Sequence, residues 1–124
     1  MTVTPIGVDH VAVNVSDVPA AIDFYTNVLG LKIDVSRPDF GIAGAWLDAG
    51  GQQVHLIELP VPPKMGQHLA LLYDDLNAVV EELRAQGLKV TDPVSSGPNR
   101  HQAFLSDPWG NGIELHHHPR GEAG

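Results

Sequence analysis

The chain contains no cysteine, and this absence excludes disulfide bonds, thiolate chemistry and cysteine-based zinc fingers. Basic residues are scarce, with 7 Lys and Arg against 15 Asp and Glu. The resulting formal net charge of −8 argues against nucleic acid or an anionic membrane as a partner. The charge alone does not identify a partner of another kind.

Long apolar runs are also missing from the sequence. No window approaches the roughly 18 apolar residues that a membrane-spanning helix needs. The segment MTVTPIGVDH has no cationic start followed by an apolar stretch, so no signal peptide is expected. With 43% hydrophobic residues over 124 positions, we expect residues 1–124 to form one cytoplasmic globular domain with its own core.

An internal repeat is the main positive feature of the sequence. The stretch HVAVNVSDVPAAI, residues 10–22, returns as HLALLYDDLNAVV, residues 68–80. A second block agrees at nearly the same offset, because Asp48, Gly51, Val54 and Leu56 precede Asp107, Gly110, Ile113 and Leu115 in the same order. Two related halves are therefore predicted, rather than a long repeat array.

Each half shows the pattern strand, helix, strand, strand, strand. In the first module, residues 8–59, strands are expected at 8–15, 31–36, 43–48 and 53–59, and helical spacing runs from Val18 to Leu29 with Gly30 closing the helix. In the second module, residues 68–118, strands are expected at 68–73, 88–92, 101–106 and 112–116, a helix at 76–83 and a loop at 95–99. The three prolines of residues 60–67 mark a linker. The sequence predicts an α+β fold of two βαβββ modules. Each sheet buries one face against its helix, and curling both sheets around a shared cavity is one solution for the second faces.

Strand periodicity places polar side chains opposite the aliphatic face that packs on each helix. On this argument His10, His68 and Glu114 face away from the helices. On the last strand of the first module, periodicity does not choose between His55 and Glu58. The repeat favours His55, because it occupies the position that Glu114 holds in the second module.

Three imidazoles and one carboxylate suit a divalent ion such as zinc, nickel, cobalt, manganese or iron(II). An ion held by His10, His55, His68 and Glu114 keeps positions free for water and substrate, can polarise a carbonyl group and lowers the pKa of bound water. Three consecutive histidines, His116, His117 and His118, resemble a metal-binding tract, but a solvated end is expected for them. His116 lies on the same strand face as Glu114 and could reach the cavity rim. The sequence also offers candidates for binding an anionic substrate, for which a solubilising role is expected instead: Arg37, Asn99, Arg100 and His101.

Two segments resemble the vicinal oxygen chelate superfamily, which includes glyoxalase I, methylmalonyl-CoA epimerase, extradiol dioxygenases and the fosfomycin and bleomycin resistance proteins. They are DHVAVNVSDVPAAIDFYTNVLGLKI, residues 9–33, and SDPWGNGIEL, residues 106–115. The resemblance implies paired βαβββ modules that form an open barrel around a divalent metal, and a homodimer. It also implies ligands on the first and fourth strand of each module, which here are His10, His55, His68 and Glu114.

The resemblance implies a small-molecule substrate that chelates the ion through neighbouring oxygens. Lyase or isomerase chemistry is favoured, with Glu114 as the proton carrier. Glyoxalase I and the epimerase resemble each other in having a carboxylate or amide where this chain has His55, so this chain has one fewer acid or base candidate. One alternative is an extradiol-type dioxygenase with His10, His68 and Glu114 as ligands and His55 as an acid or base beside them. Another is a resistance protein that binds a drug or metabolite without catalysis.

Overall fold

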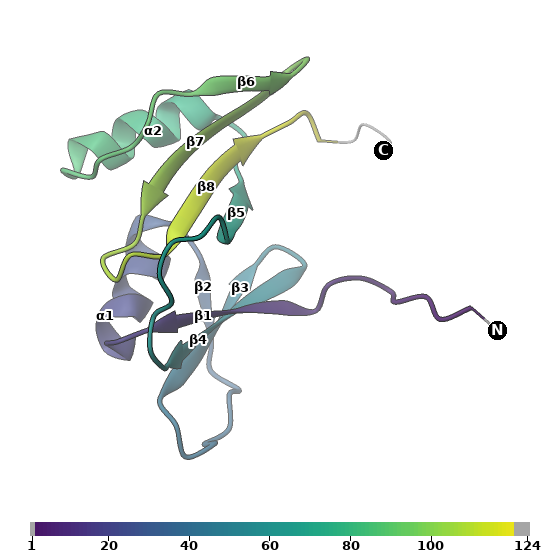
Figure 1. The fold of residues 1–124 in the computed structure, drawn as a ribbon, viewed down its shortest axis with the longest axis vertical. Coiled ribbons are helices and arrows are strands. Elements are labelled where there is room, and N and C mark those ends of the chain that lie inside the picture. The colour runs from purple at the N-terminus through teal and green to yellow at the C-terminus, as the bar shows by residue number, and fades with distance from the viewer. Residues whose placement is uncertain (1, 121–124) are drawn as a thin grey trace. The chain divides into compact units, whose positions relative to one another are not determined.

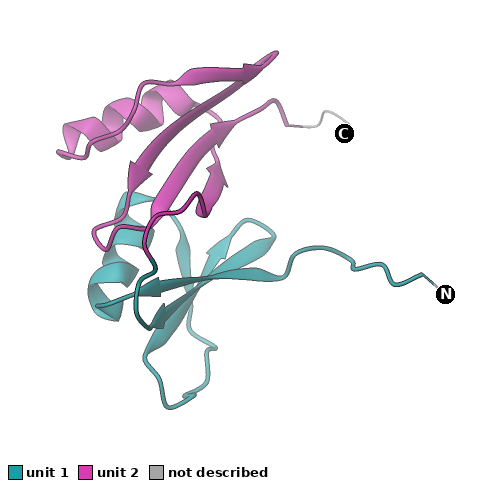
Figure 2. Cartoon of the chain, viewed as in Figure 1, with its two compact units in different colours: residues 1–62 teal, residues 63–124 magenta. Residues whose placement is uncertain are grey.

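The computed structural model describes residues 2–120, and the chain divides into two compact units, Met1–Pro62 and Pro63–Gly124 (Figure 2). The division falls inside the proline-rich segment 60–67. Each unit has one four-stranded mixed sheet. The two units are described separately below, as unit 1 and unit 2.

Unit 1 has the element order strand, helix, strand, strand, strand (Figure 1). Its elements are β1 (His10–Val15), α1 (Val18–Asp23), η1 (Phe24–Val28), β2 (Lys32–Asp34), β3 (Gly44–Ala49) and β4 (Gln52–Glu58). The strand order is β1-β4-β3-β2, with β1 parallel to β4 and the other neighbours antiparallel. Because β1 pairs with β4, the first and last strands of the unit lie side by side.

The helix of unit 1 begins as the sequence predicts. The Asp17 carboxylate accepts the backbone N–H of Ala20 at 3.1 Å, which satisfies one of the free donors of the first turn. The regular α-helix ends at Asp23 and continues as one π-helical segment, in which the Leu29 N–H bonds to the Phe24 carbonyl. Gly30 then takes a φ of +89°, the left-handed conformation that closes helices.

The core of unit 1 lies between its helix and one face of its sheet. Val54 and Leu56 on β4 are 2% and 0% exposed, and Leu47 on β3 is 0% exposed. The helical segments contribute Ala21 and Tyr25, both also 0% exposed. Since side chains alternate along a strand, His55 lies on the opposite face of β4 from Val54 and Leu56.

Unit 2 repeats this topology. Its elements are β5 (His68–Leu72), α2 (Leu76–Ala85), β6 (Val94–Gly97), β7 (Arg100–Ser106) and β8 (Gly112–His117), in the strand order β5-β8-β7-β6. Asp75 caps α2 through the Ala78 N–H, as Asp17 caps α1. The helix lies across one face of the sheet (Figure 1). Leu83, Ile113 and Leu115 form the centre of this core, with exposures of 2%, 0% and 0%.

One predicted strand is wrong. Residues 88–92 form no strand, and the third element of unit 2 is β6, in the segment predicted as a loop at 95–99. The Thr91 N–H donates to the Phe104 carbonyl. The Phe104 N–H, however, donates to the Thr91 hydroxyl at 2.8 Å rather than to a backbone carbonyl. Pro93 then removes the next donor. A backbone ladder therefore starts only after the proline.

The α+β class and the paired βαβββ modules are confirmed. The closure of the sheets around a shared cavity stays a prediction. Among residues 2–120, no helix is long and apolar enough to cross a membrane.

Candidate metal centre

Each unit brings two of the four predicted ligands together on the sheet face that lies away from its helix. In unit 1 the rings of His10 and His55 stack, with centroids 3.8 Å apart and planes 16° apart. The other side of the His55 ring stacks on Trp46, with centroids 4.9 Å apart. Register explains the contact with Trp46, since Trp46 on β3 is the direct partner of His55 on β4.

Gln53 fixes which nitrogen of His55 carries the proton. The Gln53 amide NH₂ donates to Asp34 at 2.7 Å and to Asp48 at 2.9 Å, so its oxygen is the atom that lies 2.8 Å from His55 Nε2. An amide oxygen only accepts, so His55 Nε2 donates and Nδ1 keeps a lone pair. Hydrogen bonds from the Ser36 hydroxyl and backbone N–H, and then from Gln53, lower the pKa of Asp34, which keeps that carboxylate ionised.

The environment of His55 also keeps its ring neutral. Burial is the largest cause that lowers the pKa of His55, and the charge of a protonated His10 is the next. His10 Nδ1 lies 2.8 Å from the Asp9 carboxylate. A carboxylate accepts this proton, so His10 Nε2 is the nitrogen left for another partner.

Unit 2 holds His68 and Glu114 edge to edge instead of face to face. His68 Nδ1 donates to the Gly66 carbonyl at 2.8 Å, which directs Nε2 at Glu114 Oε1, 3.2 Å away. In the neutral ring Nε2 has a lone pair, and an ionised carboxylate has only lone pairs. A cation between these two atoms, either a proton or a metal ion, satisfies both of them.

The second oxygen of Glu114 is held by a neighbour on the same strand. Glu114 Oε2 lies 2.8 Å from His116 Nδ1, and the Glu114 side chain is only 12% exposed. Since an ionised carboxylate cannot donate, His116 supplies the proton of this hydrogen bond. The arrangement orients Oε1 toward His68.

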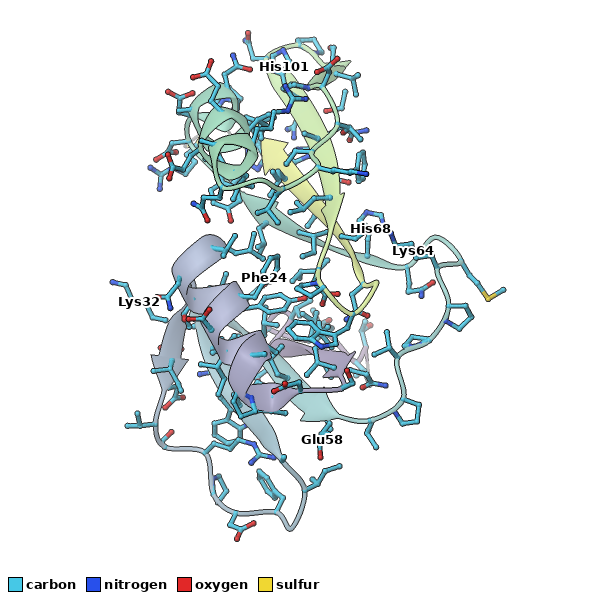
Figure 3. All side chains as sticks on the ribbon, turned by 90° about the vertical axis from the view of Figure 1, so that its left-hand side faces the viewer. Phe24, Lys32, Glu58, Lys64, His68 and His101 are labelled. Atoms are coloured by element: carbon cyan, nitrogen blue, oxygen red, sulfur yellow. The ribbon has the colours of Figure 1, made fainter. Side chains whose placement is uncertain are left out.

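The other candidates from the sequence do not join these pairs. Glu58 has the parity of the buried Val54 and Leu56, and it is exposed at the end of β4 (Figure 3). His101 is the second residue of β7 and lies at the end of the sheet away from His68 (Figure 3), and His117 bonds to the Tyr73 carbonyl. Arg37 donates to the Ile42 carbonyl and lies over the Phe40 ring.

Within residues 2–120 no group of three or more His, Asp or Glu side chains is placed to hold a metal ion. The four predicted ligands are therefore brought together as two pairs, one in each unit. In both units a residue two positions away on the fourth strand contacts the predicted ligand, Gln53 in unit 1 and His116 in unit 2. The sequence offered a signal for these two residues, because positions i and i+2 share a strand face, but the contact of Gln53 was missed and His116 was placed only at the rim.

The donors fit a divalent ion in their chemistry. Each of the three histidines has one ring nitrogen bonded to an oxygen acceptor, namely Asp9, Gln53 or the Gly66 carbonyl. Metal-binding histidines in proteins nearly always have such a partner, which leaves the other nitrogen for the ion. The nitrogens left for an ion are Nε2 of His10, Nδ1 of His55 and Nε2 of His68, and the last of these faces Glu114 Oε1 at 3.2 Å.

Comparison with known proteins identifies relatives over most of the chain. The lactoylglutathione lyase of Escherichia coli O157:H7 is 32% identical over 120 residues, covering 86% of this chain and 88% of that protein. The 2-epi-5-epi-valiolone epimerase of an Actinomyces species is 29% identical over 150 residues, covering 94% of this chain and 81% of that protein.

A solved structure of a Bacillus anthracis protein, described as belonging to the glyoxalase family, superposes with a TM-score of 0.83 at 26% identity. The match covers 96% of this chain and all of that one. It confirms the glyoxalase-like fold. The model of one family matches residues 7–115, and this chain therefore belongs to the Glyoxalase/Bleomycin resistance protein/Dioxygenase superfamily.

Proposed function

We propose that this protein is a metal-dependent enzyme that acts on a small substrate through neighbouring oxygen atoms, with lyase or isomerase chemistry. His10, His55, His68 and Glu114 are the proposed ligands. The observation that carries the proposal is the shared hydrogen-bond pattern of the three histidines, which leaves one nitrogen of each ring for a cation. Sequence similarity to a lyase and to an epimerase supports lyase or isomerase chemistry.

The donor set selects the class of ion. Three imidazoles and one carboxylate suit zinc, nickel, cobalt, manganese or iron(II). Bound there, such an ion would polarise a carbonyl oxygen of the substrate and would make the adjacent C–H more acidic. The protein's part is to hold the donors in place and to move the proton.

Glu114 is the proposed proton carrier. It is the single carboxylate of the set, and its Oε1 is the atom we propose to take the substrate proton and return it. His116 keeps hold of Oε2 at 2.8 Å, so Oε1 can change partner while the side chain stays oriented. A base must come within hydrogen-bond reach of the proton that it abstracts, and this tether restricts where Oε1 can move.

Deuterium exchange tests this role. Metal-loaded protein is incubated in D₂O with a panel of small 2-hydroxycarbonyl compounds, and loss of the C–H signal is followed by proton NMR. We expect exchange with at least one compound, and its loss in Glu114→Gln, which keeps an oxygen donor but removes the base. Exchange that is equally fast in Glu114→Gln contradicts the assignment.

The dioxygenase alternative also has an observation in its favour. His55 Nε2 donates to the Gln53 side chain, and the His10 and Trp46 rings stack on the His55 ring. These contacts suit a His55 that acts as an acid or base beside an ion held by two histidines and one carboxylate. Cobalt(II) substitution separates the two ligand sets, since its visible spectrum responds to a lost ligand. An unchanged spectrum in His55→Ala, together with oxygen uptake with catechols by the iron(II) form, favours the dioxygenase.

We propose that the protein is a homodimer, as its resemblance to the superfamily implies. A mixing experiment asks whether one chain or two supply the pairs for an ion. His10→Ala/His55→Ala protein keeps the pair of unit 2, and His68→Ala/Glu114→Ala protein keeps the pair of unit 1. Metal binding that returns when the two variants are mixed assigns the pairs to different chains, and no return assigns them to the same chain.

A further inference from the structure

Unit 2 contains a groove of about 620 Å³ that borders the His68 side chain. Its walls include both apolar and polar groups: Lys64, His68, Lys89, Thr91, Phe104 and Ser106. Lys64 and His68 lie on the same side of unit 2 (Figure 3). The groove is large enough for a small organic molecule.

The charge of the groove is opposite to that of the protein as a whole. The chain has only three lysines, at positions 32, 64 and 89, and a net charge of −8. Two of these three lysines line this groove, and no Asp or Glu is among its lining residues. In a protein with so few basic residues, this local concentration favours an anionic ligand.

Lys64 is held over the groove by its surroundings. Its ammonium group donates to the Ser106 hydroxyl. The segment that carries it is braced by the Gln67 side chain, which accepts the Met65 N–H at 3.0 Å and donates to the Pro63 carbonyl at 2.8 Å. A lysine that is already positioned loses less side-chain entropy when a ligand binds.

The other wall suits the carbon skeleton of a ligand. The Phe104 ring contacts the His68 ring edge to face, with centroids 6.0 Å apart. Gly112 also lines the groove and brings no side chain into it. The Thr91 hydroxyl accepts from the Phe104 N–H, so its own proton is free to be donated to a ligand.

We propose that the substrate carries an anionic group, a phosphoryl group or a carboxylate, which Lys64 and Lys89 bind in this groove. The inference rests on the proposed function, because His68 joins the groove to the proposed ion. The chelating oxygens lie at His68 and Glu114, and the charged end lies at the two lysines. The two lysines are then specificity residues and take no part in the proton transfer.

The test uses the full chain without metal, titrated separately with inorganic phosphate and with acetate while amide signals are followed in ¹H–¹⁵N spectra. We expect saturable shifts at Lys89, Thr91 and Ser106. Lys64→Ala and Lys89→Ala each weaken binding about tenfold, the scale of one lost charge-assisted hydrogen bond. Lys32→Ala removes the same charge from β2 in unit 1 and leaves binding unchanged. Saturation by phosphate alone identifies a phosphoryl group, and saturation by acetate a carboxylate.

Two results overturn the inference: no saturable shift with either anion, or an equal loss of binding in Lys32→Ala. A thermal melt of each variant shows that the fold is kept. Since the titration is done without metal, its failure and that of the proposed function are distinct. Metal uptake without anion binding overturns only the anionic substrate, and anion binding without metal uptake overturns only the metal-dependent chemistry.

Discussion

The two units share a topology and differ in the surroundings of their proposed ligands. In unit 1 the His55 ring stacks on the His10 ring and on the Trp46 ring, and Gln53 links His55 by hydrogen bonds to the two carboxylates of Asp34 and Asp48. In unit 2 His68 meets Glu114 edge to edge, beside a groove that contains two lysines. One half provides stacked aromatic rings, and the other provides a carboxylate and two lysines.

This difference separates what the backbone determines from what the side chains determine. The positions of the pairs follow from the strand order, because the parallel pairing of first and fourth strands brings them together in both units. The chemistry of each pair follows from the next residue on the same face, Gln53 or His116.

The largest effect is expected from removing one ligand of the charged pair. Glu114→Ala leaves His68 Nε2 without its partner, so affinity for the proposed ion falls by more than the roughly 10- to 100-fold that loss of a supporting hydrogen bond costs. Competition with a fluorescent chelator measures the change. Glu58→Ala, which removes an exposed carboxylate from β4, is the control. An equal loss in both variants would mean that only overall charge matters.

Core truncation tests whether the two units are equivalent in stability. Leu56 on β4 and Leu115 on β8 occupy matching places, and both are 0% exposed. Either residue changed to Ala lowers the free energy of unfolding by about 2–5 kcal/mol through lost burial and the cavity left behind. Urea denaturation measures the loss. A cost below 1 kcal/mol, roughly the loss of one buried methylene, in either variant would break the equivalence of the two cores.

Removing the supporting residues compares the two halves directly. Gln53→Ala frees the His55 ring to change its tautomer, and His116→Ala frees Glu114 Oε2. Each substitution lowers metal affinity by roughly 10- to 100-fold. Isothermal titration with zinc measures both. An effect confined to His116→Ala would support the three-ligand set, in which His55 does not bind the ion.

The smallest effect is expected at the helix caps. Asp17→Ala and Asp75→Ala each remove one side-chain bond to the first turn, at a cost of about 1 kcal/mol in the free energy of unfolding. Asp17→Asn and Asp75→Asn keep the acceptor and should retain most of the stability. A loss in the Asn variants as large as in the Ala variants would assign the effect to charge rather than to the hydrogen bond.

The repeat predicted much of the fold. It paired Asp17 with Asp75, and both prove to cap helices, while Gly30 and Gly87 have the positive φ expected of helix ends. The prediction of a strand at 88–92 is wrong because the hydrophobic pattern carries no information on hydrogen bonding. Here the Thr91 hydroxyl accepts the Phe104 N–H in place of a backbone carbonyl. The spacing of aliphatic residues indicates which side chains are buried, but a strand also needs backbone hydrogen bonds to a neighbouring strand.

The candidate site was less accessible to sequence reasoning. The alternation of side chains along each strand predicted that His10, His68 and Glu114 lie on the sheet faces away from the helices, as they do in the structure. It could not tell which oxygen acceptor each ring contacts, so the hydrogen bond between His55 and Gln53 was missed. The lysine groove was also missed, since Lys64 comes from the proline-rich segment and Lys89 from the segment after α2, and only folding brings them to one groove.

The central claim is that the two pairs bind one divalent ion, and elemental mass spectrometry of the untagged protein tests it most directly. The account predicts about one transition metal ion for each set of four ligands, lost in His68→Ala/Glu114→Ala and retained in Glu58→Ala. Absence of bound metal in the wild-type protein, even after nickel, zinc, manganese and iron(II) have been added, would contradict it. A protein that binds its ligand without metal would then be the better account of this chain.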